Sequence, residues 1–204
     1  MNSCDLAIKK LAAYLKAEVT DLQEVYADWP DPKDQLKMPC ASIISAGTRG
    51  FRHQQPEFFK KTVNEENPDL DDVVYTIGQY DYTIQLDLWA EYKPQRGSLY
   101  EKVHDALNKQ FLSGDQPCGL SLAVEEYHGM IARFDQVGYT FMDSEESSQR
   151  SEWRVKIDVL VTHSKLAVKT QSRMQEIIVQ HQVSDTTTSE TNQPSNEETY
   201  ELEP

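Results

Sequence analysis

The side chains best suited to catalysis in this sequence are its histidines and carboxylates. The five histidines are widely separated and show no metal-binding spacing, and no GxxxxGK[ST], GxGxxG or GxSxG motif is present. Only the fold could bring His104 or His128 to a carboxylate, and acidic residues are too numerous for one pair to stand out. A small carboxylate-dependent hydrolase therefore stays open as an alternative, and it requires a deep pocket. The motifs themselves predict no catalytic residue, no cofactor and no metal site.

A charged segment near residue 150 offers a different chemistry. An acidic stretch at 143–149 is followed at once by basic residues at the start of a predicted strand. Such a juxtaposition suits a head-to-tail ring, in which the acidic loop of one subunit meets the basic strand of the next. A solvated hairpin tip with locally neutralised charges explains the pattern at least as well. The interface candidates are Asp143, Glu145, Glu146, Arg150, Arg154 and Lys156.

A second candidate contact region is the stretch from 48 to 72. It mixes charges with glycine and proline, and no periodicity is visible, so the sequence predicts a long irregular insertion loop. Phe58 and Phe59 lie at its centre. If these side chains are exposed, they are suited to contact a neighbouring molecule. If the loop folds back, they form an aromatic cluster on their own domain. The sequence leaves both readings open.

Composition narrows the classes of function. The chain has 34 acidic and 20 basic residues and a net charge of −14. Such a surface repels phosphate backbones, so direct nucleic-acid recognition is not expected. The three cysteines are far apart and form no ligand spacing, which is typical of free buried thiols in a reducing compartment. A cleaved signal and a membrane-spanning run of apolar residues are both missing, so we expect no membrane association.

Periodicity predicts the elements that position these candidates. Two helices are expected, one over 3–19 with Ser3 as N-cap and one over 99–111 that follows Pro94 and has Ser98 as N-cap. Between Val73 and Glu91 apolar and polar residues alternate, and Asp81 and Asp87 fall on the face predicted to be polar and solvated. Further strands are expected at 22–26, 40–46, 120–127, 130–141 and 152–163.

This order predicts an α+β fold, with a mostly antiparallel sheet and two helices packed on one of its faces. The folded domain is expected at 1–164, including the 48–72 loop. Residues 165–183 keep β-branched content and are predicted to form an extended arm that pairs with another chain. Residues 184–204 hold six acidic and no basic residues, so we expect this tail to be disordered.

With the elements placed, the chain resembles the tail terminator (tail completion) and neck proteins of long-tailed bacteriophages. The resemblance rests on a first helix followed by Glu24-Val-Tyr-Ala-Asp-Trp-Pro30, and on two further segments. They are Tyr80-Asp-Tyr-Thr-Ile-Gln-Leu-Asp-Leu-Trp89 and Gly138-Tyr-Thr-Phe-Met-Asp-Ser-Glu-Glu-Ser-Ser-Gln-Arg-Ser-Glu-Trp-Arg154. It covers roughly residues 1–163.

The resemblance implies a non-enzymatic virion subunit that forms a ring, a hexamer, on the completed tail tube. Its partners would be other copies of itself, the tail tube protein, the head-tail connector or neck proteins and, in a contractile tail, the sheath. The 48–72 insertion and the extension beyond 164 depart from the minimal subunit. Another neck component, such as a head-completion adaptor or a collar protein, therefore remains an alternative. So does a regulatory module that uses its acidic tail as a decoy for basic surfaces.

Overall fold

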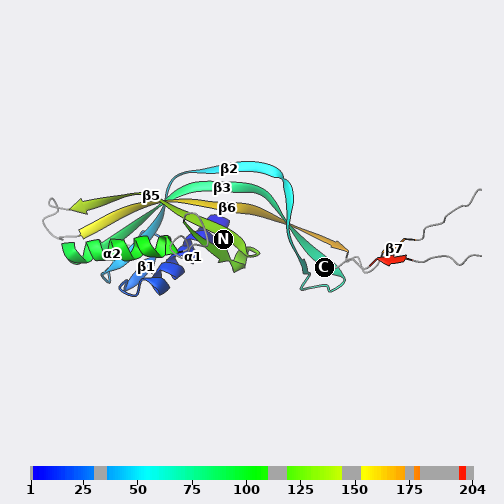
Figure 1. The fold of residues 1–204 in the computed structure, drawn as a ribbon, viewed down its shortest axis with the longest axis horizontal. Helices are drawn as coiled ribbons and strands as arrows, with labels where there is room; N and C mark the ends of the chain where they lie inside the picture. The colour runs from blue at the N-terminus through cyan, green and yellow to red at the C-terminus, as the bar shows by residue number, and fades with distance from the viewer. Residues whose placement is uncertain are drawn as a thin grey trace, which may run out of the picture. The chain divides into compact units, whose positions relative to one another are not determined.

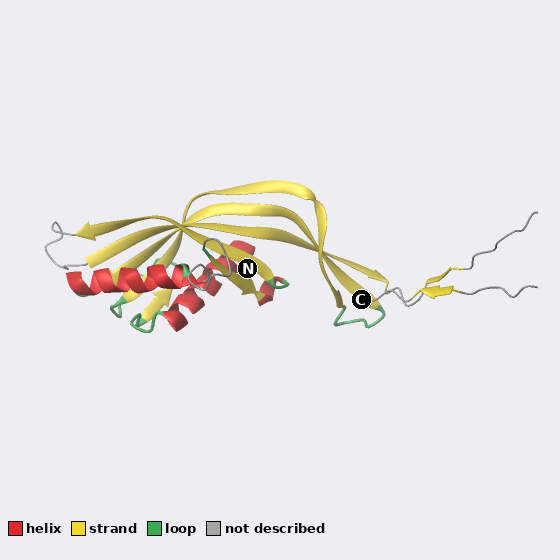
Figure 2. Ribbon diagram, viewed as in Figure 1, coloured by secondary structure: helices red, strands yellow, loops and turns green. Residues whose placement is uncertain are grey.

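A computed structural model describes residues 2–29, 36–109, 119–143, 153–172, 177–179 and 198–200 of the chain. Within these ranges the fold is α+β, as predicted: two α-helices accompany a mostly antiparallel sheet (Figure 2). The helices are α1 (Ser3–Glu18) and α2 (Lys93–Leu107). The strands of the main sheet are β1 (Glu24–Tyr26), β2 (Cys40–Val63), β3 (Leu70–Ala90), β4 (Leu120–Val124), β5 (Met130–Asp143) and β6 (Trp153–Ser172).

The main sheet has the strand order β1-β2-β3-β6-β5-β4 (Figure 1). Its one parallel pair in the described part of the chain joins β1 to the first three residues of β2. β5 runs antiparallel to both neighbours and shifts register by one residue between Gln136 and Gly138, which is a β-bulge. A short 3-10 turn, η1 (Glu125–Tyr127), links β4 to β5.

Both helices lie on the same side of the sheet (Figure 1), where alternate strand residues are buried. Leu11 and Leu15 of α1 and Leu99 and Val103 of α2 are almost inaccessible to solvent. Beneath them the sheet supplies Ile84, Leu86, Leu88, Phe134, Val155, Ile157 and Val159 to the same core. None of the described helices is both long and apolar enough to cross a membrane.

The helix starts differ from the predicted ones. Asn2, and not Ser3, caps α1, because the backbone N–H of Asp5 donates to the Asn2 side-chain oxygen at 2.9 Å. α2 begins at Lys93, so the predicted cap at Ser98 is wrong. Pro94 lies in the first turn of α2, where a backbone N–H would have no acceptor within the helix. The lack of an N–H in proline therefore costs no hydrogen bond there.

The prediction of an irregular loop over 48–72 is wrong. β2 continues through Val63, and only the segment 64–69 connects it to β3. The side chains at 50–59 are all exposed. A strand that is solvated on both faces has no buried face to select apolar residues at every second position, so it lacks the period-two signal.

The chain divides into two compact units, one of residues 1–60 and 74–168, the other of 61–73 and 169–204. In the second unit Asn64 organises the β2–β3 turn, with its side-chain oxygen accepting from the N–H groups of Glu66 and Asn67. Thr170 donates to Asp72 at 2.7 Å, so β6 extends past the predicted domain limit at residue 164.

The same unit contains a small antiparallel pair, β7 (Ile177–Val179) with β8 (Glu198–Tyr200). Residues 198–200 of the predicted disordered tail are therefore a strand. The rest of 184–204, like 173–176 and 180–183 of the predicted arm, lies outside the described residues.

Candidate assembly surface

β2 is a long strand with an unpaired side. β1 covers only Cys40–Ser42, and no other strand in the described ranges pairs with β2 on that side. Unpaired N–H and C=O groups along a sheet edge are a template for another chain. Phe58 and Phe59 lie on this strand, and 66% of the Phe58 side chain is exposed. Of the two readings of these phenylalanines, exposure fits Phe58, while Phe59 is only at the border of exposure.

A close contact holds β2 against β3. A Cβ placed on Gly78 of β3 would lie 2.5 Å from the Phe51 ring and 2.6 Å from the carbonyl oxygen of Arg52. Only glycine permits this approach, and the Phe51 ring then packs on Tyr80 with 4.7 Å between ring centroids. Arg52 also pairs with Asp81 at 3.1 Å. These contacts fix the position of β2 beside β3 without an apolar core beneath it.

Arg154, predicted to face a neighbouring subunit, is bound within its own chain. Its guanidinium contacts Asp87 at 2.8 Å and lies over the rings of Trp29 and Trp89, 5.1 and 4.9 Å from their centroids. The two tryptophans meet edge to face at 5.7 Å. Ion pairing and cation–π contact together hold the segment after β1 against β3 and β6.

The prediction that Asp87 is a solvated residue is wrong. Its side chain is 0% exposed, and it accepts hydrogen bonds from Arg154 and from the Gln85 amide at 2.8 Å. Asp87 does point away from the helices, as the alternation predicted. The error was to treat that face as open, because the Trp29 segment and Arg154 cover it here.

The other charged candidates divide into two groups. Lys156 pairs with Asp158 two residues along β6 at 3.3 Å, and both side chains are about one-third exposed. Such local pairing agrees with the alternative interpretation, in which the charges near residue 150 are neutralised within the same chain. Asp143 ends β5 opposite Trp153, and its side chain is not described. Glu145, Glu146 and Arg150 lie outside the described residues.

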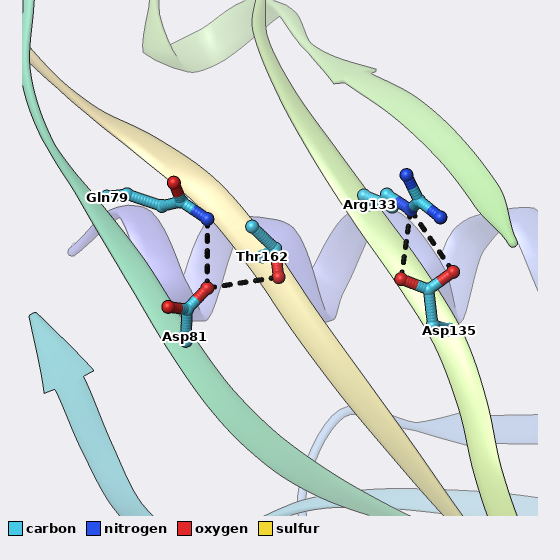
Figure 3. A network of polar contacts seen from close by, with 5 residues as sticks. All are labelled: Gln79, Asp81, Arg133, Asp135 and Thr162. Atoms are coloured by element: carbon cyan, nitrogen blue, oxygen red, sulfur yellow. Dashed lines mark hydrogen bonds and ion pairs between the residues drawn. The ribbon is translucent and has the colours of Figure 1, made fainter. Parts of the chain in front are cut away.

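The sheet face opposite the helices is polar further along β3, β6 and β5 (Figure 3). Asp81 accepts from Thr162 of β6 at 3.1 Å and from Gln79 at 3.0 Å. On β5 the Arg133 side chain donates to both oxygens of Asp135, at 3.1 and 2.9 Å. These groups are joined in short local networks within the sheet, which is typical of a solvated face.

Aromatic residues gather where the second half of β5 passes α2. Tyr100 of α2 packs on Tyr139 and Phe141, with ring centroids 4.5 and 5.5 Å apart, and both β5 rings remain exposed. The buried Arg96 lies 4.8 Å from the Phe141 ring and donates to the Met142 carbonyl at 3.1 Å. β4 pairs only with Met130–Phe134, so this half of β5 is a second sheet edge among the described strands.

The hydrolase alternative requires carboxylates and a histidine in one pocket. An open depression between α1 and α2 is lined by Glu18, Asp21 and Asp105, but lysines bind two of these carboxylates. Lys109 lies 2.6 Å from Glu18, and Lys102 lies 2.5 Å from Asp21.

Within the described part of the chain, neither candidate histidine contacts a carboxylate. His104 contacts Gln136 at 2.9 Å and stacks on Tyr100. His128 occupies the left-handed turn before β5, beside Tyr127. Within the described ranges no group of three or more potential metal ligands comes together.

Two pKa shifts near the depression have structural causes. Burial, followed by the charge of Glu18, raises the pKa of Tyr14, whose hydroxyl donates to the Ala106 carbonyl at 2.9 Å. The hydrogen bond to Glu18 raises the pKa of Lys109. Both groups keep their ordinary protonation state at neutral pH, so they act as ties between the two helices.

No protein-family model matches this chain, and neither does any curated protein sequence.

Proposed function

We propose that this chain is a tail terminator of a long-tailed bacteriophage, a virion subunit that closes into a hexameric ring at the head-proximal end of the tail tube. The ring ends tail polymerisation and joins the tail to the head connector and neck proteins. In a contractile tail it also contacts the sheath. Assembly takes place in the host cytoplasm, and no catalytic residue or cofactor takes part.

The observation that carries this proposal is where the three segments behind the family resemblance meet. Trp29 comes from the first segment, Asp87 and Trp89 from the second, and Arg154 from the third. The Arg154 guanidinium contacts all of the other three. Segments that are far apart in sequence thus build one cluster, which supports reading the resemblance as one shared subunit fold.

The exposed strand supports an assembly role in a second way. β2 offers unpaired backbone groups and exposed aromatic side chains, whereas the depression between α1 and α2 is open and crossed by lysine–carboxylate pairs. A surface of this kind favours contact with another chain over the enclosure of a small substrate.

The test is the mass of the purified protein, measured by light scattering, alone and mixed with tail tubes. A hexamer has a mass of about 140 kDa, six times the 23.4 kDa of the chain. Negative-stain images of the mixture should show rings on one end of each tube, and tubes assembled with the protein should stop growing. A twelve-fold ring would favour the adaptor, and a protein that stays monomeric with and without tubes would contradict the proposal.

A further inference from the structure

The first unit of the chain has two open sheet edges on opposite sides of one sheet. Beyond Ser42 the outer side of β2 meets no described strand, and the same holds for β5 beyond Phe134 (Figure 1). When two different surfaces of a subunit bind each other, the same contact can repeat head to tail from one copy to the next. The copies form a closed ring if the rotation between neighbours adds up to a full turn. Two unlike edges are a geometry of this type.

The two edges are similar in length. Gly47 has a φ of +92° within β2, and we take residues 48–55, between Gly47 and Pro56, as the open segment. On β5 the Met142 carbonyl already accepts from Arg96, which leaves 135–141 for a partner. Each segment is therefore about one ordinary strand long.

The edges also differ in charge. Residues 48–55 include two basic residues and no acidic one. Residues 135–141 include one acidic residue and no basic one. A β2 edge that met a second β2 edge would place like charges across the ladder, which is destabilising, whereas β2 against β5 pairs opposite charges.

The close contact with Gly78 indicates which β2 groups face outward. The Arg52 carbonyl oxygen would lie 2.6 Å from a Cβ placed on Gly78, so the backbone groups of Arg52 point toward β3. Backbone groups alternate in direction along a strand, so the N–H groups of His53 and Gln55 point outward. His53 is thus a donor available to a partner strand in the segment before Pro56.

We propose that neighbouring copies join head to tail by adding residues 48–55 of β2 in one copy to residues 135–141 of β5 in the next, so that one sheet continues from subunit to subunit. This rests on the proposed ring and names the contact that closes it. The exposed side chains Val137, Tyr139 and Phe141 of β5 then gain cover from the β2 side chains of the next copy.

The main-chain test compares His53→Pro with His53→Ala in the full chain, each analysed by light scattering and circular dichroism. His53→Pro removes an outward N–H while the pairing of β2 with β3 stays intact, so we expect a folded monomer. His53→Ala keeps the N–H and should assemble like the wild type. Equal assembly of both variants would overturn the proposed contact.

The orientation test uses two exposed positions, Gln55→Cys and Thr140→Cys, and a short bis-maleimide. Each variant alone, and the wild type with its own cysteines, should give no cross-linked dimer, whereas a mixture of the two should give one. Cross-linking of Gln55→Cys with itself, or none in the mixture, would overturn head-to-tail pairing. A wild type that forms rings despite that result would leave the proposed function standing, and a wild type that never assembles would contradict both.

Discussion

The substitution Arg154→Met probes the cluster that joins the three resembling segments. It removes the only described cation within ion-pair distance of Asp87, a carboxylate that is 0% exposed, and leaves its charge buried. Breaking a buried pair by removing one partner costs about 3–5 kcal/mol. The Arg154 side chain is itself 20% exposed, so water can replace part of the interaction and the lower end applies, about 3 kcal/mol.

The measurement is the free energy of unfolding from urea titration, followed by tryptophan fluorescence because Trp29 and Trp89 lie on the guanidinium. For a domain of this size, about 3 kcal/mol lowers the Tm by roughly 6–12 °C. Lys156→Met is the matched control, since Lys156 lies two residues along the same strand in a partly exposed pair worth about 0–1 kcal/mol.

Adding Asp87→Asn to Arg154→Met should recover part of the lost stability, because the uncompensated charge is gone. If Arg154→Met unfolds within about 1 kcal/mol of the control, or if the double variant is no more stable than Arg154→Met alone, the assignment of a buried ion pair is refuted.

Three other outcomes follow from local geometry. Gly78→Ala should lower the unfolding free energy by about 1–3 kcal/mol, because its Cβ would overlap Phe51; an unchanged urea midpoint would contradict this packing. Gly97→Ala should instead raise stability by about 0.5–1 kcal/mol, since it lies inside α2 with nothing within 4 Å of its Cβ, and a loss in the same titration would count against the helix there. The raised pKa of Tyr14 means that the folded state holds its proton more tightly, so stability should fall as pH rises above the unfolded value, near 10. Tyr14→Phe should flatten this fall, and an identical pH profile in both proteins would disprove the pKa assignment.

The parts of the fold that the sequence predicted well are those with one buried face. Ile84, Leu86 and Leu88 alternate with polar residues, and both helices show an apolar stripe, so the two-helix α+β arrangement follows from periodicity alone. The part of β2 beyond the predicted strand at 40–46 escaped prediction, because the side chains at 50–59 are exposed and carry no periodic signal.

The candidate site was harder to predict because its residues act through distant partners. Asp87 occupies a polar position in the alternation, and nothing next to it in sequence indicates that Trp29 and Arg154 cover it. Arg154 belongs to a basic run, which suggested contact with another subunit, but only the fold reveals the buried carboxylate opposite it. The sequence did contain one signal for this ion pair, because each of its two residues has a tryptophan nearby. Trp89 lies close to Asp87, and Trp153 precedes Arg154.

The central claim, that this chain forms a closed ring on the tail tube, is tested most directly by the mass and symmetry of its complex with purified tail tubes. We predict six copies in one ring at one end of each tube. A chain that remains a 23.4 kDa monomer at every concentration and never binds the tubes would contradict it.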